Sequence, residues 1–149
     1  MFLTLLTLEN LLDINEQIKK RALIDHRIEY TGSEDYPIKI NELKKLIYLA
    51  PENRTVIEVA AYYLKNIILL QAFPDANHRT ALTATERFLE KNSYRFDYKA
   101  SEAYQFRKEL YNRRLHEYGT YEERPISILK ESNNQVFSLC LEFISAHIK

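Results

Sequence analysis

The segment from residue 71 to residue 79, QAFPDANHR, holds the side chains whose types and spacing could do chemistry. It follows an apolar stretch and precedes a new helix that is expected to begin near Asn77. Helix starts present unpaired backbone N–H groups and a partial positive charge, so they favour anions, phosphate above all. Arg79 would add a forked donor and Asn77 an amide donor to the same anion. The segment therefore predicts a phosphate site.

Two other residues of this segment have an expected place in such a site. Asp75 precedes the helix and is free to hold Mg²⁺, which usually binds through one or two carboxylates and phosphate oxygens. Phe73 is expected to point inward and pin the loop. Plainer explanations stay open: Asn77 as a helix cap, Asp75 as favourable dipole chemistry and His78 as a surface residue without a metal partner.

Two helices must position the segment. Residues 55–70 are apolar on nearly every side, which predicts a buried central helix capped by Asn53 or Thr55. The second helix is expected over 77–91, with Asn77 as its N-cap. The remaining helices are expected over residues 8–29, 41–49, 100–117 and 131–148, and extended segments near 30–40 and 93–98.

Composition limits the class of protein. The chain has 149 residues, the usual size of one domain, and only two glycines, which disfavours a many-stranded sheet. We therefore expect one all-α domain over residues 1–149. Its 21 basic and 21 acidic residues give no net charge, which argues against direct nucleic-acid binding. The single Cys140 lies in an apolar run and is interpreted as a buried hydrophobe. No stretch predicts a membrane span or a signal peptide, so a cytoplasmic protein is expected.

The order of residues 71–79 resembles the motif of Fic and Doc proteins. That motif runs His, any residue, Phe, any residue, Asp or Glu, Gly or Ala, Asn, Gly or Lys, Arg. The run DANHRTAL is most similar to the Doc ("death on curing") branch, and the similarity extends over residues 4–98, whereas 99–149 match loosely and form a helical extension. The motif positions that agree are Phe73, Asp75, Asn77 and Arg79.

The resemblance implies a compact helical bundle with a short extended or β-hairpin flap, and a reaction. Such proteins move part of ATP or another nucleoside triphosphate onto a protein hydroxyl: typical Fic members transfer AMP, and Doc transfers the terminal phosphate. By matching position, Asp75 would hold Mg²⁺. The phosphate site would be lined by Asn77, His78 and Arg79, and a flap that docks the target by main-chain pairing would comprise Glu34, Asp35, Tyr36, Pro37, Ile38 and Lys39.

Two positions depart from the AMP-transferring pattern. Where those members have a second Arg, this chain has Leu82, as Doc does, which favours phosphate transfer. Where the family has its catalytic His, this chain has Gln71, which cannot take a proton from the attacking hydroxyl near neutral pH. Loss of a general base typically costs about a hundredfold to ten-thousandfold in rate. Gln71 is either a change that quenches a toxic enzyme or the native residue of a binding module.

Three functional hypotheses follow. The first is a Doc-like toxin that phosphorylates a Ser, Thr or Tyr hydroxyl, with a component of the translation machinery as the target. The second is an AMP-transferring Fic enzyme, and the third a nucleotide-binding pseudoenzyme that acts through partners. The self-inhibiting motif of many Fic proteins is not met, because Leu5 stands where it needs Ser or Thr before Glu9 and Asn10. A separate antitoxin protein is therefore the expected regulator.

Overall fold

The computed structural model describes residues 2–25, 27–28, 30, 37–118 and 135–149. Within this part the chain forms helices and no sheet, which confirms the all-α expectation, and Phe96 pairs with Ile148 in an isolated antiparallel bridge. The described helices are α1 (Leu8–Ile24), α2 (Ile40–Tyr48), α3 (Val56–Leu70), α4 (Asn77–Lys91), α5 (Ala100–Tyr118) and α6 (Gln135–His147).

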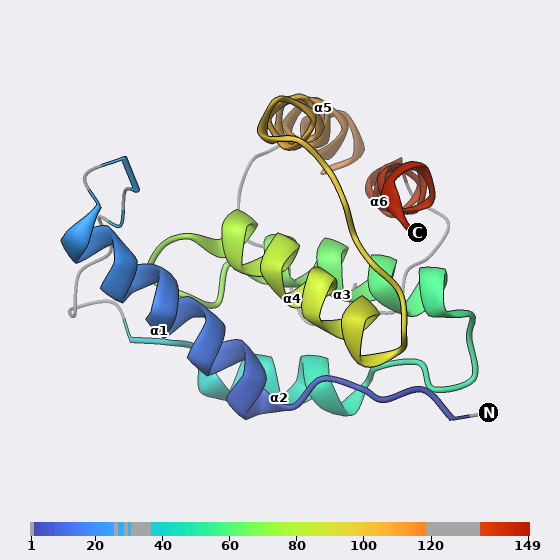
Figure 1. Cartoon of the computed structure of the whole chain (residues 1–149), viewed down its shortest axis with the longest axis horizontal. Helices are drawn as coiled ribbons and strands as arrows, with labels where there is room; N and C mark the ends of the chain where they lie inside the picture. Colours follow the sequence, from blue (N-terminus) through green and yellow to red (C-terminus); the bar gives the residue numbers. More distant parts are fainter. Residues whose placement is uncertain (1, 26, 29, 31–36, 119–134) are drawn as a thin grey trace.

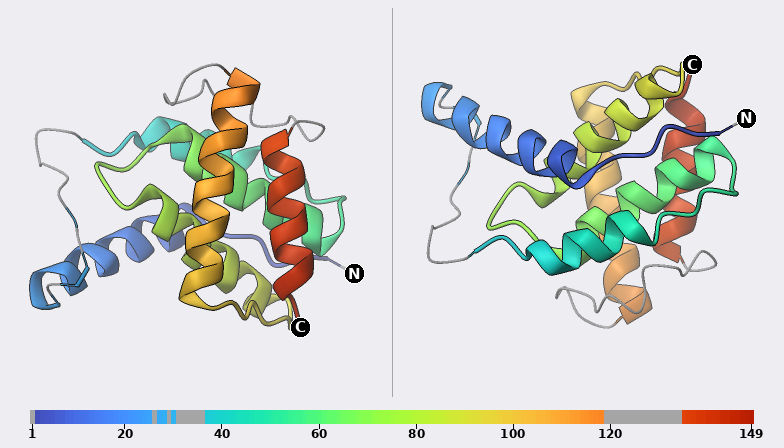
Figure 2. Two further views of the ribbon diagram at one scale, coloured as in Figure 1. Left: turned by 90° about the horizontal axis from the view of Figure 1, so that it is seen from above. Right: turned by 90° about the horizontal axis from the view of Figure 1, so that it is seen from below.

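The helices lie in three layers (Figures 1 and 2). The middle layer is α3 and α4, which pack along each other. On one side α1 contacts α4 and α2 contacts α3, while on the other side α6 contacts α3 and α5 contacts α6. The loop that connects α3 to α4 lies at one end of this helix pair, beside α1 and the start of α2.

The central position of α3 follows from its sequence. Every residue from Val59 to Leu70 is buried, as the apolar stretch predicts. Burying a Leu or Ile side chain contributes about 1.5–3 kcal/mol, so this helix is a main source of stability. Thr55 is the N-cap: its hydroxyl accepts a hydrogen bond from the Glu58 N–H at 3.2 Å, and the Glu58 carboxylate accepts from the Thr55 N–H at 3.3 Å. This reciprocal capping box fixes where α3 begins.

The predicted end of the first helix was wrong. The pattern indicated a helix to residue 29, but α1 ends at Ile24. The carboxylate of Asp25 accepts hydrogen bonds from the backbone N–H and the guanidinium of Arg27, each at 3.0 Å, and so stabilises a turn. Short polar side chains that bond to nearby backbone compete with helix in this way. In the last helix, residues 131–134 of the predicted span lie outside the described residues.

Candidate functional site: the loop between α3 and α4

Gln71 ends α3. Its backbone is left-handed, with φ 49° and ψ 46°, a conformation that costs most residues other than glycine about 1–2 kcal/mol. The side chain offsets part of this cost, because its Nε2 donates a hydrogen bond of 2.7 Å to the Ile68 carbonyl. The last carbonyls of a helix have no partner within it, so Gln71 satisfies one of them. Residue 71, where the family motif has His, is thus held at the C-terminal end of α3.

Asn77 is the first residue of α4, and the expectation that it is the N-cap was wrong, since Ala76 occupies that place. The Asn77 carboxamide instead folds back onto the loop: Oδ1 accepts from the Phe73 N–H at 3.0 Å, and Nδ2 donates to the Phe73 carbonyl at 3.0 Å. Nδ2 also lies 3.4 Å from Oε1 of Gln71. The side chain therefore links the loop to the first residue of α4. The contact of Asn77 with an anion stays a prediction.

Ala76 leaves the start of α4 without a side-chain cap. Its φ of 60° is left-handed, and it has no oxygen to accept hydrogen bonds from the first turn, in contrast to Thr7 of α1 and Thr55 of α3. The Asp75 Oδ1 accepts from the Ala76 N–H at 2.6 Å, ahead of the helix. The first turn of α4 also contains no acidic residue. Among the described residues no N-cap side chain bonds to its N–H groups, and such a helix start favours an anion.

The other motif residues lie around this helix start. Arg79 is exposed in the first turn of α4, and Asp75 is half-buried just before it. Phe73 is buried with 4% of its surface exposed, so it points inward as expected. Leu82, in place of a second Arg, is buried at 6% exposure. Among the described residues no three His, Cys, Asp or Glu side chains gather into a metal site, so Mg²⁺ at Asp75 would need ligands from a phosphate.

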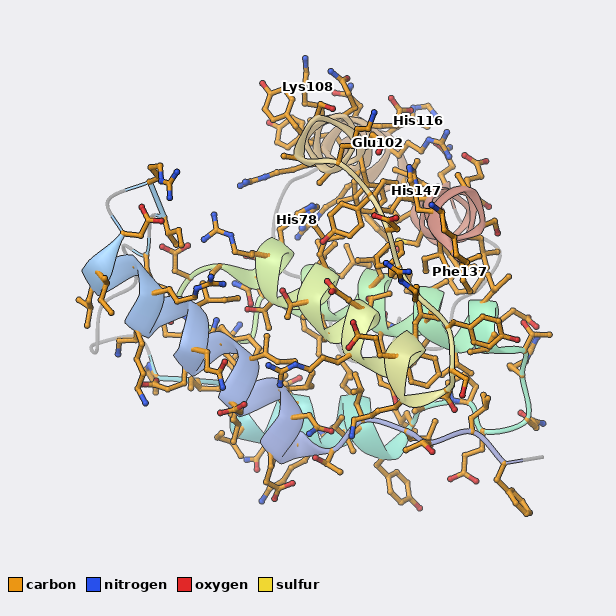
Figure 3. The ribbon with its side chains drawn as sticks, in the orientation of Figure 1. His78, Glu102, Lys108, His116, Phe137 and His147 are labelled. Atoms are coloured by element: carbon orange, nitrogen blue, oxygen red, sulfur yellow. The ribbon has the colours of Figure 1, made fainter. Side chains whose placement is uncertain are left out.

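His78 is half-buried with its ring turned inward, so the expectation of a surface residue was wrong. Its ring packs against Phe106 of α5, with centroids 5.6 Å apart, and both ring nitrogens are buried without a hydrogen-bond partner among the described residues (Figure 3). Burial, reinforced by the charge of Arg107, lowers the pKa of His78 to about 4. The imidazole is therefore neutral near neutral pH and faces α5 instead of the loop.

Comparison with known protein families agrees with the resemblance of the motif. Residues 5–89, more than half of the chain, match the family model for the Fic/DOC family. The chain belongs to the Fic/DOC family. Membership indicates a Fic-type transferase that uses a nucleoside triphosphate. No curated protein and no solved structure matched the chain.

The matched region contains α1, α2, α3 and all but the last two residues of α4, so it includes the whole α3–α4 loop, whereas α5 and α6 follow it. Cys140 of α6 is buried as predicted, and burial raises the pKa of its thiol. No described helix is both long enough and apolar enough to cross a membrane.

The flap predicted for this Fic/DOC chain is described in part. Glu34, Asp35 and Tyr36 lie outside the described residues. The backbone N–H of Lys39 donates a hydrogen bond of 2.9 Å to the Ala72 carbonyl, so Lys39 lies beside the loop, and Pro37 and Ile38 directly precede it in the chain. Main-chain pairing thus joins the end of the predicted flap to the loop.

Two residues that are distant in sequence contact the loop and could not be found from the motif. Asn15 of α1 donates from Nδ2 to the Asp75 carbonyl at 3.0 Å, and Tyr30 donates from its hydroxyl to Asn15 Oδ1 at 3.0 Å. One signal was available: Asn15 is a polar residue on the apolar side of the predicted first helix. Its partner, however, lies 60 residues away and follows only from the packing of α1 on α4.

Proposed function

We propose that this chain is a Doc-like phosphotransferase, the toxin of a toxin–antitoxin pair, in which Gln71 impairs turnover. The observation that carries the proposal is the uncapped start of α4 directly beside residue 71. The side chains of Gln71 and Asn77 lie 3.4 Å apart across the loop, so an anion at the helix start would be next to the catalytic position. Phosphate of a nucleotide is the anion that such a helix start favours.

In the proposed reaction, a hydroxyl oxygen of a protein target forms a bond to the γ-phosphorus of ATP. The bond from that phosphorus to the bridging oxygen breaks, and ADP leaves with the electron pair. Asp75 would hold Mg²⁺ together with phosphate oxygens, and Arg79 with the N–H groups of α4 would stabilise the negative charge. The proton of the hydroxyl would go to a base at position 71 in family members that have His there, and would have to go to water in this chain.

Gln71 cannot supply that base, because a carboxamide does not titrate near neutral pH. Both ends of its side chain are also engaged: Nε2 with the Ile68 carbonyl and Oε1 near Asn77. Positioning and charge stabilisation would remain. The missing proton transfer raises the barrier by about 3–5 kcal/mol, the equivalent of about a hundredfold to ten-thousandfold in rate.

The choice of phosphate over AMP transfer has support from Leu82. AMP-transferring relatives use a second Arg at this position, and here the side chain is an aliphatic residue buried at 6% exposure. AMP transfer by a Fic enzyme stays the alternative within the family. A second candidate function, a nucleotide-binding pseudoenzyme that acts through partners, has support from Gln71, whose engaged carboxamide behaves as a structural part of the loop.

The biological setting belongs to the same proposal. The target would be a cytoplasmic protein of the translation machinery, docked along residues 33–40 by main-chain pairing. The regulator would be an antitoxin protein in trans, because the self-inhibiting motif is not met at Leu5. The net charge of zero supports a protein target over a nucleic acid.

The experiment is Gln71→His, assayed by transfer of label from γ-labelled and α-labelled ATP into a cell lysate. We expect at least about a hundredfold more transfer than with the starting protein, the low end of general-base effects. The label should come from the γ position. Histidine tolerates the left-handed backbone at position 71 better than most residues do, so the variant should fold.

Gln71→Asn is the matched control, since Asn also tolerates a left-handed backbone but has no titratable group. It should give no gain in transfer. Label from the α position would favour the AMP-transferring alternative. A histidine variant that folds, binds ATP and transfers nothing would replace the phosphotransferase by the pseudoenzyme.

A further inference from the structure

Asn15 is a buried amide on the inner side of α1. Only 3% of its surface is exposed, and the other buried residues of this helix are Leu11, Ile14 and Ile18. An amide moved out of water is unfavourable unless its donors and acceptor find partners. The partners of Asn15 therefore explain why a polar residue is tolerated at this position.

Both donors of Asn15 are directed at the far side of the α3–α4 loop. Nδ2 donates to the Asp75 carbonyl at 3.0 Å and to Oγ1 of Thr80 at 3.1 Å. Asp75 precedes α4 and Thr80 lies within its first turn, where the Thr80 N–H donates to the Ala76 carbonyl at 2.8 Å. One side chain thus joins the loop and the first turn of the helix.

The acceptor of Asn15 is engaged by Tyr30, whose hydroxyl donates to Oδ1 at 3.0 Å. Burial, with the charges of Asp75 and Glu16, raises the pKa of this phenol, so it remains a donor at physiological pH. With Oδ1 held by Tyr30, the Nδ2 group must face the loop. Tyr30 therefore fixes the orientation of the Asn15 amide.

We propose that Asn15 is a positioning residue of the loop, oriented by Tyr30. By holding the Asp75 carbonyl it fixes the peptide between Asp75 and Ala76, and with it the direction of the Asp75 carboxylate and the left-handed turn before α4. These groups would meet Mg²⁺ and phosphate, so the consequence for nucleotide binding rests on the proposed function. The consequence for the loop itself does not.

The test is amide hydrogen exchange of the full chain, read at residues of the loop and of the core. Phe73 and Ala76 have amides that bond within the loop, to Asn77 Oδ1 and Asp75 Oδ1, and Leu64 lies in the buried middle of α3. In Asn15→Leu we expect the Phe73 and Ala76 amides to exchange about tenfold faster relative to Leu64, as lost hydrogen bonds of this kind imply.

Leu11→Ala is the matched control, because Leu11 lies one turn away on the same buried side of α1. This variant should destabilise the whole protein and raise the exchange rates of all three amides by the same factor. The exchange rates of Phe73 and Ala76 relative to Leu64 should therefore stay unchanged. Tyr30→Phe is a milder variant that keeps both donors of Asn15, and it should shift the ratio in the same direction by a smaller factor. An unchanged ratio in both Asn15→Leu and Tyr30→Phe would overturn the proposal.

The second readout is calorimetric titration with ATP and Mg²⁺. We expect about tenfold weaker binding in Asn15→Leu and unchanged binding in Leu11→Ala, because the loop bonds are lost in the first variant alone. Equal affinities in Asn15→Leu and the starting protein would overturn the role in nucleotide binding. If the starting protein itself binds no ATP while the exchange ratio still shifts, the proposed function fails and the positioning of the loop by Asn15 is supported.

Discussion

The buried imidazole of His78 gives the protein a defined sensitivity to acid. Burial and the charge of Arg107 lower its pKa from 6.5 to about 4 in the folded state. The unfolded chain therefore binds a proton more readily than the folded chain does, and the stability due to the neutral ring is lost as the pH falls from about 6.5 towards 4. At about pH 4.5 the loss amounts to about 2–3 kcal/mol, an appreciable part of the stability of a typical domain.

The perturbation is His78→Phe, which keeps an aromatic ring against Phe106 and removes both buried nitrogens. Urea unfolding at about pH 7.5 and about pH 4.5 gives the change in the free energy of unfolding on acidification. We expect this change to be about 2–3 kcal/mol smaller in the variant than in the starting protein. Equal changes in the two proteins would refute the assignment of His78 as a buried neutral group.

His147 supplies a control of opposite sign. Its ring bonds to Glu102 at 2.9 Å and to the Phe143 carbonyl at 2.8 Å, between α5 and α6 (Figure 3). Burial alone would lower its pKa, but the bonds to Glu102 and Phe143 raise the pKa above its usual value. The stability that His147 contributes is present below the pKa of its ring in the unfolded chain. It is lost as the pH rises through the pKa of the ring in the folded protein. His147→Gln should therefore not reduce the loss of stability on acidification.

Two further predictions concern the start of α4. Arg79→Ala should weaken binding of ATP with Mg²⁺ in a calorimetric titration while leaving the thermal midpoint nearly unchanged, since this exposed side chain contributes little to the core; unchanged affinity would remove Arg79 from the site. Asp75→Asn should abolish the enhancement of ATP binding by Mg²⁺, because one carboxylate holds the ion only together with phosphate oxygens; equal enhancement in both proteins would place the ion elsewhere.

The parts of the fold that the sequence predicts best are those that depend on residues close together in the chain. Thr55 with Glu58 forms a capping box that is visible in the sequence, and the apolar run up to Leu70 has no polar side to expose. The start of α3 then follows from its capping box, and the separation of α3 from α4 follows from the break at Pro74. The end of α1 was mispredicted because its apolar pattern continues past Ile24, while the side chain of Asp25 stabilises a turn.

The parts of the site that sequence could not predict depend on distant packing. His78 is buried because α5 lies over the start of α4, and Phe106 is 28 positions further along the chain. Asn15 reaches Asp75 because α1 crosses α4. A motif gives the order of residues along the chain, and neither contact lies within the motif. Both contacts change the chemistry: one removes a charge from position 78, and the other holds the loop.

Asn77 illustrates how one motif residue can have a role different from the one its type indicates. An Asn at a helix start is expected to cap the helix or to donate to a bound anion. Here one N–H of its carboxamide is used by the Phe73 carbonyl and the other points to Gln71, while Oδ1 is used by the Phe73 N–H. An anion at the start of α4 would therefore meet backbone N–H groups and Arg79 first. The Asn77 side chain keeps that backbone, and Gln71 beside it, in place.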